Sequence, residues 1–152
     1  MKVDIKQLLT SERVATGIRA ENWEAAVRAA GRLLVESGGA EESYIQGMIN
    51  TTKELGAYIV IAPGLAIPHS RPEDGVIQPC MAVAVLETPV PFGHTENDPV
   101  SVLIAFGAVD HSQHIAALQQ MAEILSDPDN LAALRTAKTP EKILEIMWSA
   151  SI

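Results

Sequence analysis

Four histidines are the side chains of this 152-residue sequence best suited to chemistry at neutral pH: His69, His94, His111 and His114. A neutral imidazole has a nitrogen lone pair that can act as a nucleophile, a base or a metal ligand. His69 follows a short apolar run, in GLAIPHSRP. Strand ends that lead into irregular backbone commonly display reactive side chains. An ordinary histidine in a turn fits the same position, and the local sequence does not decide between the two interpretations.

His114 lies close to the predicted start of a helix. Asp110 is a suitable N-cap residue, and Gln113 stands where it could complete a capping box. A helix N-terminus carries partial positive charge and free N–H groups, so it suits an anion such as phosphate. The alternative, which is the more common case for one such residue, is that His114 continues the core stripe of Leu118 and Met121.

Other catalytic patterns are weak or absent. The spacing of His111 and His114, with Asp110 beside them, supplies ligand types for zinc, but no second ligand pair accompanies them and Cys80 belongs to another segment. There is no GxSxG elbow, no GxxxxGK[ST] loop and no GxGxxG after a strand. We therefore expect neither a metal nor a cofactor.

Composition limits the classes of partner. The net charge of −8 argues against nucleic acid and anionic membranes, which bind clustered Lys and Arg, but it permits contact with a basic protein surface. The sequence has no signal-peptide pattern and no apolar stretch of membrane-spanning length. Cys80 is the only cysteine, which agrees with a reducing compartment. We expect a cytoplasmic protein.

Hydrophobic periodicity predicts one domain over residues 1–152, with helices before and after a group of strands. The pattern predicts helices from Asn22 to Gly38, around Tyr44 to Leu55, after Asp110, and from Pro128 and Pro140. It predicts strands at 57–61, 65–67, 81–86 and 100–106, the last two covered on both faces because they are continuously apolar. This order is typical of a layered α/β or α+β domain with helices packed on a central sheet.

Three segments together resemble a known family. GLAIPHSRPEDGV, LETPVPFG and NDPVSVLIAFGAVDHSQHIAALQQMAEIL resemble the IIA component of the bacterial phosphoenolpyruvate-dependent sugar phosphotransferase system, of the mannitol–fructose type. The resemblance covers nearly the whole chain and implies an α/β fold with a central mixed β-sheet flanked by helices. Within that type, ELGAYIVIAPGLAIPHSRPE is most similar to the ascorbate-specific IIA proteins. The nitrogen-related regulatory IIA proteins share the scaffold and remain the alternative.

The resemblance implies roles for particular residues. His69 corresponds to the histidine that carries the phosphoryl group, and His114 to the second active-site histidine, which stabilises that group during transfer. The family has an arginine sixteen positions before the first histidine, where this chain has Lys53. Lysine offers a point charge in place of the two-pronged arginine fork, so Lys53 and Arg71 are both candidates for the phosphate's positive partner.

The resemblance also implies partners. HPr would donate the phosphoryl group, a cysteine of a IIB component would accept it, and the membrane component IIC would move the sugar, with ascorbate or a related sugar as the expected substrate. In the regulatory alternative, phosphorylation of His69 would control a partner protein. We expect an apolar rim around the site, with Ile67 and Phe92 as candidates. The oligomeric state, including a homodimer, stays open.

Overall fold

The computed structural model describes residues 4–150, so the two ends of the predicted domain, residues 1–3 and 151–152, lie outside the described part. Six α-helices and five strands occur in that part, together with three short 3₁₀ turns. The strands are β1 (Val14–Ile18), β2 (Val60–Ala62), β3 (Leu65–Ala66), β4 (Cys80–Val90) and β5 (Val100–Gly107). The helices are α1 (Ile5–Leu8), α2 (Trp23–Glu36), α3 (Glu42–Leu55), α4 (His111–Leu125), α5 (Pro128–Thr136) and α6 (Pro140–Ala150).

The five strands form one mixed sheet in the order β1-β4-β5-β3-β2. β4 pairs antiparallel with β5, and β2 pairs antiparallel with β3. β1 runs parallel to β4, and β3 runs parallel to β5. The fold is thus a single α/β domain with a central mixed sheet, as the family resemblance implied.

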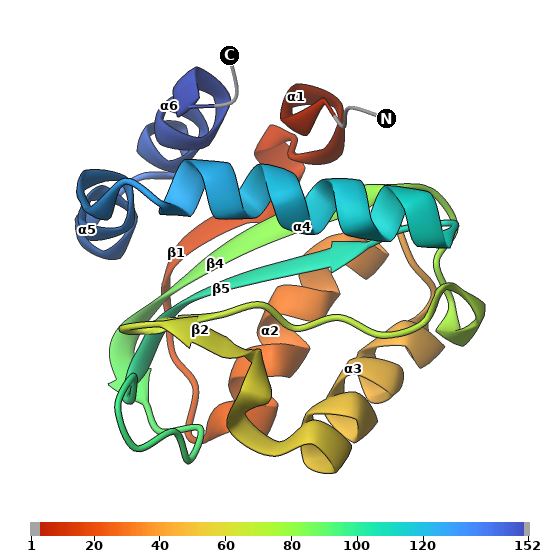
Figure 1. The fold of residues 1–152 in the computed structure, drawn as a ribbon, viewed down its shortest axis with the longest axis horizontal. Coiled ribbons are helices and arrows are strands. Elements are labelled where there is room, and N and C mark those ends of the chain that lie inside the picture. The colour runs from red at the N-terminus through yellow and green to blue at the C-terminus, as the bar shows by residue number, and fades with distance from the viewer. Residues whose placement is uncertain (1–3, 151–152) are drawn as a thin grey trace.

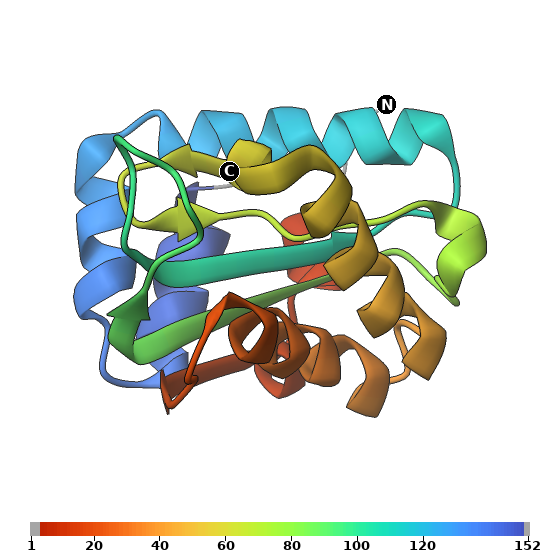
Figure 2. The same cartoon turned by 90° about the horizontal axis from the view of Figure 1, so that it is seen from below.

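Helices cover both faces of this sheet, so the core consists of two clusters. Helices α1, α4, α5 and α6 pack on one face, and α2 and α3 pack on the other (Figure 1). Seen from below, the sheet lies between α4 and α2 (Figure 2). Along β4, Met81 and Val83 face the first cluster, whereas Ala82 and Ala84 face the second. This alternation explains the continuous apolar run, because a strand covered on both faces needs apolar side chains at every position.

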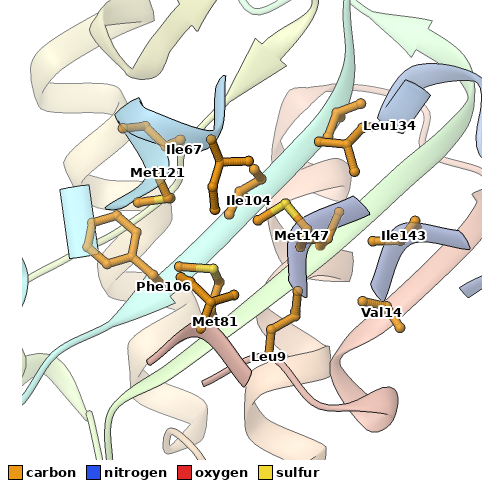
Figure 3. Packing of buried hydrophobic residues seen from close by; sticks show 14 of the residues in the cluster. Leu9, Val14, Ile67, Met81, Ile104, Phe106, Met121, Leu134, Ile143 and Met147 are labelled. Atoms are coloured by element: carbon orange, nitrogen blue, oxygen red, sulfur yellow. The ribbon is translucent and has the colours of Figure 1, made fainter. Parts of the chain in front are cut away.

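The first cluster is filled by aliphatic and sulfur-containing side chains. In Figure 3, Met121 of α4 and Met147 of α6 lie against Ile104 and Phe106 of β5. All four side chains are at most 1 % exposed. With few aromatic residues in the chain, methionines fill gaps between branched side chains because the thioether is flexible and polarizable.

Local capping sets the helix boundaries that the sequence predicted. The side chain of Asn22 accepts a hydrogen bond from the Ala25 N–H at 2.9 Å, and the side chain of Asp110 accepts one from the Gln113 N–H at 2.8 Å. The predicted capping box at α4 is altered, since the Gln113 side chain accepts from the N–H of Val109, at 3.1 Å, and not from that of Asp110. No helix within residues 4–150 is both long and apolar enough to cross a membrane.

The secondary structure differs from the predicted pattern at four elements. The strand predicted at 57–61 begins only at Val60, because Gly56 has a φ of 68° and a 3₁₀ turn, Gly56–Ile59, follows it. The short helix α1 and the edge strand β1 were not predicted. β4 continues to Val90, further than the apolar run that ends at Leu86.

Candidate functional site

The backbone holds the His69 imidazole in one tautomer. The chain leaves β3 and runs beside β5 toward the end of the sheet where α4 begins (Figure 1). Nδ1 of His69 lies 2.8 Å from the carbonyl oxygen of Ile67, and the Ile67 N–H donates to the oxygen of Ile59 at 2.9 Å. A carbonyl oxygen can only accept, so Nδ1 carries the hydrogen. In the neutral ring Nε2 then has a lone pair directed away from this bond.

His114 lies beside His69. The two ring centroids are 5.3 Å apart in an edge-on arrangement. The ring of Phe106 is 5.2 Å from that of His69 and 5.1 Å from that of His114, so one buried aromatic side chain of β5 contacts both imidazoles. His114 is near the start of α4, where its N–H donates to the oxygen of Asp110 at 3.1 Å. The structure therefore pairs the two histidines that the sequence singled out.

Burial favours the neutral form of His114. Desolvation lowers the pKa of this imidazole below its usual range, and the nearby His69 and His111 lower it further. At neutral pH the ring is therefore uncharged and has one N–H donor and one acceptor nitrogen.

An open pocket of about 660 Å³ contains both histidines. Its walls come from the end of α3, the segment that follows β3, and the start of α4. Three acidic residues, Glu54, Glu73 and Asp110, line it together with Arg71. The volume is within the range of small-molecule sites, and it leaves room for more than a phosphoryl group.

Of the two predicted basic residues, one lines the pocket and the other does not. Arg71 is in the pocket wall, two residues after His69. Lys53 is not among the lining residues; its Nζ lies 3.9 Å from the carboxylate of Glu24 on α2. The structure therefore brings His69, His114 and Arg71 together and places Lys53 toward α2.

The pocket has exposed apolar residues, but they are not the two that the sequence analysis named. Ile67 and Phe92 are only 6 % and 8 % exposed, and Phe92 packs on Trp23 with ring centroids 6.1 Å apart, so neither forms a rim. The exposed apolar side chains that line the pocket are Leu55 and Val109.

The other histidines differ in position. His111 lines the pocket at the start of α4. His94 lies in the loop between β4 and β5, where its Nδ1 accepts the N–H groups of Glu96 and Asn97 at 3.2 and 3.0 Å. In the part of the chain that the structure describes, no three His, Cys, Asp or Glu side chains form a group that could hold a metal ion. Cys80 is fully buried, and burial raises the pKa of its thiol to about 11.

These features define a layered α/β protein with a pair of histidines in an open pocket, at the N-terminus of a helix. Residues 7–149 match the family described as the phosphoenolpyruvate-dependent sugar phosphotransferase system, EIIA 2. The chain belongs to this family and is a IIA phosphotransfer component.

Relatives and solved structures agree with this assignment. The ascorbate-specific EIIA component of Escherichia coli K12 is 35 % identical over 141 residues, which are 92 % of each chain. The solution structure of the mannitol-specific cryptic enzyme IIA CmtB from Escherichia coli has a TM-score of 0.87 at 28 % identity, covering 97 % of this chain and 99 % of that one. Escherichia coli IIA mannitol, in a complex with phosphorylated IIB mannitol, has a TM-score of 0.81 at 25 % identity, covering 93 % and 99 %.

Proposed function

We propose that Nε2 of His69 accepts a phosphoryl group from phospho-HPr and passes it to a cysteine of a IIB component. The observation that carries this proposal is the 2.8 Å hydrogen bond from Nδ1 of His69 to the Ile67 oxygen, which leaves Nε2 as the nucleophile. In the first step the Nε2–P bond forms as the donor's N–P bond breaks. In the second step an S–P bond forms on the acceptor thiolate as the bond to Nε2 breaks.

His114 has the proposed role of stabilising the phosphoryl group during transfer. A neutral imidazole 5.3 Å from the His69 ring can donate one N–H to a phosphoryl oxygen without adding a full positive charge. The lowered pKa of His114 supports this role, because the neutral imidazole then supplies an N–H donor and leaves the positive charge to another residue. The N-terminus of α4 adds partial positive charge on the same side of the pocket.

We assign the compensating positive charge to Arg71 in preference to Lys53. Phosphoryl transfer asks a protein mainly for orientation and for donors to the equatorial oxygens. Arg71 lines the pocket, and a guanidinium can contact two oxygens at once, whereas the ammonium of Lys53 lies near Glu24. Lys53 remains the weaker candidate.

The proposed partners match the pocket rim in charge and polarity. Leu55 and Val109 are exposed apolar side chains at the rim, and Glu54, Glu73 and Asp110 supply negative charge around them. A surface of this kind suits a protein with an apolar patch edged by lysine and arginine, which is the character expected of HPr. The neighbour solved with phosphorylated IIB supports the second partner. The system would act in the cytoplasm with a membrane IIC component, and the 35 % identical relative supports ascorbate or a related sugar as substrate.

The test is a labelling experiment with radioactive phosphoenolpyruvate, enzyme I and HPr. Wild-type protein and a His94→Ala control, whose histidine is outside the pocket, should gain acid-labile phosphate. His69→Ala should gain none. His114→Ala should still be labelled but should pass the group to IIB on the order of tenfold more slowly or worse, as expected for one lost hydrogen bond to a charged group.

Two results would count against the proposal. Equal labelling of the wild type and His69→Ala would move the acceptor elsewhere, and mass mapping of the modified residue would locate it. Normal transfer to IIB by His114→Ala would remove that residue from the mechanism.

A further inference from the structure

One face of α3 packs against the segment that follows His69. Tyr44, Gly47 and Thr51 lie on this face, three and four residues apart. The Thr51 and Ser70 hydroxyl oxygens are 3.1 Å apart, and a Cβ added to Gly47 would lie 3.0 Å from the Ser70 oxygen. Ser70 also donates a short hydrogen bond to the Asp74 carboxylate. The residue next to His69 is thus held by a helix that is distant in sequence.

The Tyr44 hydroxyl makes the most buried of these contacts. It donates to the carbonyl oxygen of Phe106 at 2.7 Å and accepts the N–H of Ser70 at 3.0 Å. Tyr44 has no exposed surface. Burial raises the pKa of its phenol, so the hydroxyl keeps its proton at any pH at which the protein works.

The two backbone groups that this hydroxyl joins belong to residues that contact or adjoin the two imidazoles. Ser70 follows His69 directly, and Phe106 carries the ring that contacts both imidazoles. The Nδ1 bond to Ile67 fixes the His69 ring from the preceding residues. The Tyr44 hydroxyl fixes the backbone on the following side, relative to the strand beneath the rings.

We propose that Tyr44 is a positioning residue for phosphoryl transfer: its buried hydroxyl holds the Ser70 backbone against Phe106 and so sets the direction in which Nε2 of His69 faces the partner. This inference rests on the function proposed above. Its physical basis is orientation, because transfer between two fixed atoms needs the nucleophile aligned with the bond that breaks. Tyr44 itself touches no reacting atom.

The experiment compares Tyr44→Phe, which keeps the ring and removes one oxygen, with the wild type. Single-turnover transfer is followed at increasing concentrations of phospho-HPr, at a temperature where circular dichroism shows both proteins folded. The rate constant at saturation should fall roughly 10- to 100-fold, the size of loss expected from a misplacement of up to about 1 Å. The half-saturating concentration should stay within about twofold, because the rim that docks the partner is unchanged.

Thr52→Val is the matched control. Thr52 is a buried residue of α3 whose hydroxyl donates within the helix, to the Met48 oxygen at 2.9 Å. This variant also removes a buried hydroxyl but leaves the segment after His69 untouched, so it should transfer at the wild-type rate. A general loss of helix stability would affect both variants alike.

Several outcomes would overturn the inference: a wild-type rate in Tyr44→Phe, an equal loss in Thr52→Val, or a loss confined to the half-saturating concentration. If Tyr44→Phe does not fold, amide exchange in the wild type still tests it, because a Ser70 N–H that exchanges freely cannot be held by Tyr44. A wild type that takes up no phosphoryl group would instead refute the proposed function, so the two failures are distinguishable.

Discussion

At Gly47, α3 lies close to the segment that follows His69, and Gly47→Ala tests how tightly that approach controls the site. The added Cβ would lie 3.0 Å from the Ser70 oxygen and 3.0 Å from both Cβ and Oδ2 of Asp74. That is about 0.5 Å less than the usual separation of contacting atoms. A shift of Ser70 would disturb the hydrogen bonds of its hydroxyl with Thr51 and of its N–H with Tyr44.

Two effects on stability oppose each other in this variant. Alanine favours a helix interior over glycine by about 1 kcal/mol. Overpacking at a tight contact costs about 1–3 kcal/mol. The free energy of unfolding should therefore fall by only about 0–2 kcal/mol. Transfer should suffer more, because if a 1 Å misplacement costs about a hundredfold, a shift of half that size costs roughly tenfold.

Gly31→Ala is the matched control on α2. Its added Cβ would meet side-chain atoms of Ile45 and Met48 of α3 at 2.8 Å, inside the second cluster, and so presses on α3 without touching Ser70 or Asp74. Urea denaturation measures stability, and transfer from phospho-HPr measures function. The transfer rate of Gly31→Ala, calculated per folded molecule, should equal that of the wild type. A folded Gly47→Ala with the wild-type rate, or equal losses in both variants, would refute the claim that the contact of α3 with Ser70 sets the position of His69.

Three further predictions concern charged or titratable groups. Arg71→Ala should slow phosphoryl transfer roughly 10- to 100-fold, as for a lost charged hydrogen bond, whereas Lys53→Ala should change the same assay little; the reverse order would return the role to Lys53. Arg13 is 4 % exposed and donates to the Ser37 hydroxyl at 2.7 Å and the Leu8 oxygen at 2.8 Å. Arg13→Met should lower the free energy of unfolding in urea by about 2–5 kcal/mol, and a loss well under this would mean that the Ser37 hydroxyl and the Leu8 oxygen bind water in its place. Because folding lowers the pKa of His114, the unfolded chain takes up that proton first, so stability should fall as pH drops below the ordinary value of 6.5. His114→Gln should flatten this part of the urea-midpoint profile against pH, and an unchanged profile would assign the dependence to other groups.

The parts of the fold that were predicted have local causes. Asn22 and Asp110 cap helices through their own neighbours, and the runs in β4 and β5 show burial on both faces. The 3₁₀ turn before β2 was not predicted because its run of apolar residues is typical of a strand, although Tyr58 is 79 % exposed. Strand β1 was missed because only Val14 in it is fully buried.

Some residues of the candidate site also have a local sequence signal, and others do not. His69, His114 and Arg71 could be found from motif and spacing, and the pocket brings them together. The sequence also indicates that Lys53 faces away from the pocket. It is two residues from the pocket-lining Thr51, which places it about 200° around the helix. Tyr44 and Phe106 had no sequence signal, because their roles depend on contacts between distant segments.

The sheet divides the core into two clusters, and each cluster has one tryptophan whose fluorescence can report on it. The chain has two tryptophans: Trp23 packs against the cluster under α2 and α3, and Trp148 packs against the one under α4 and α6. The indole N–H of Trp148 also donates to the Leu9 oxygen at 2.9 Å. Replacing either indole by phenylalanine leaves a single emitter on one side of the sheet. Coincident fluorescence transitions from the two proteins would mean that both layers melt as one cooperative unit, and separate ones would reveal which layer opens first.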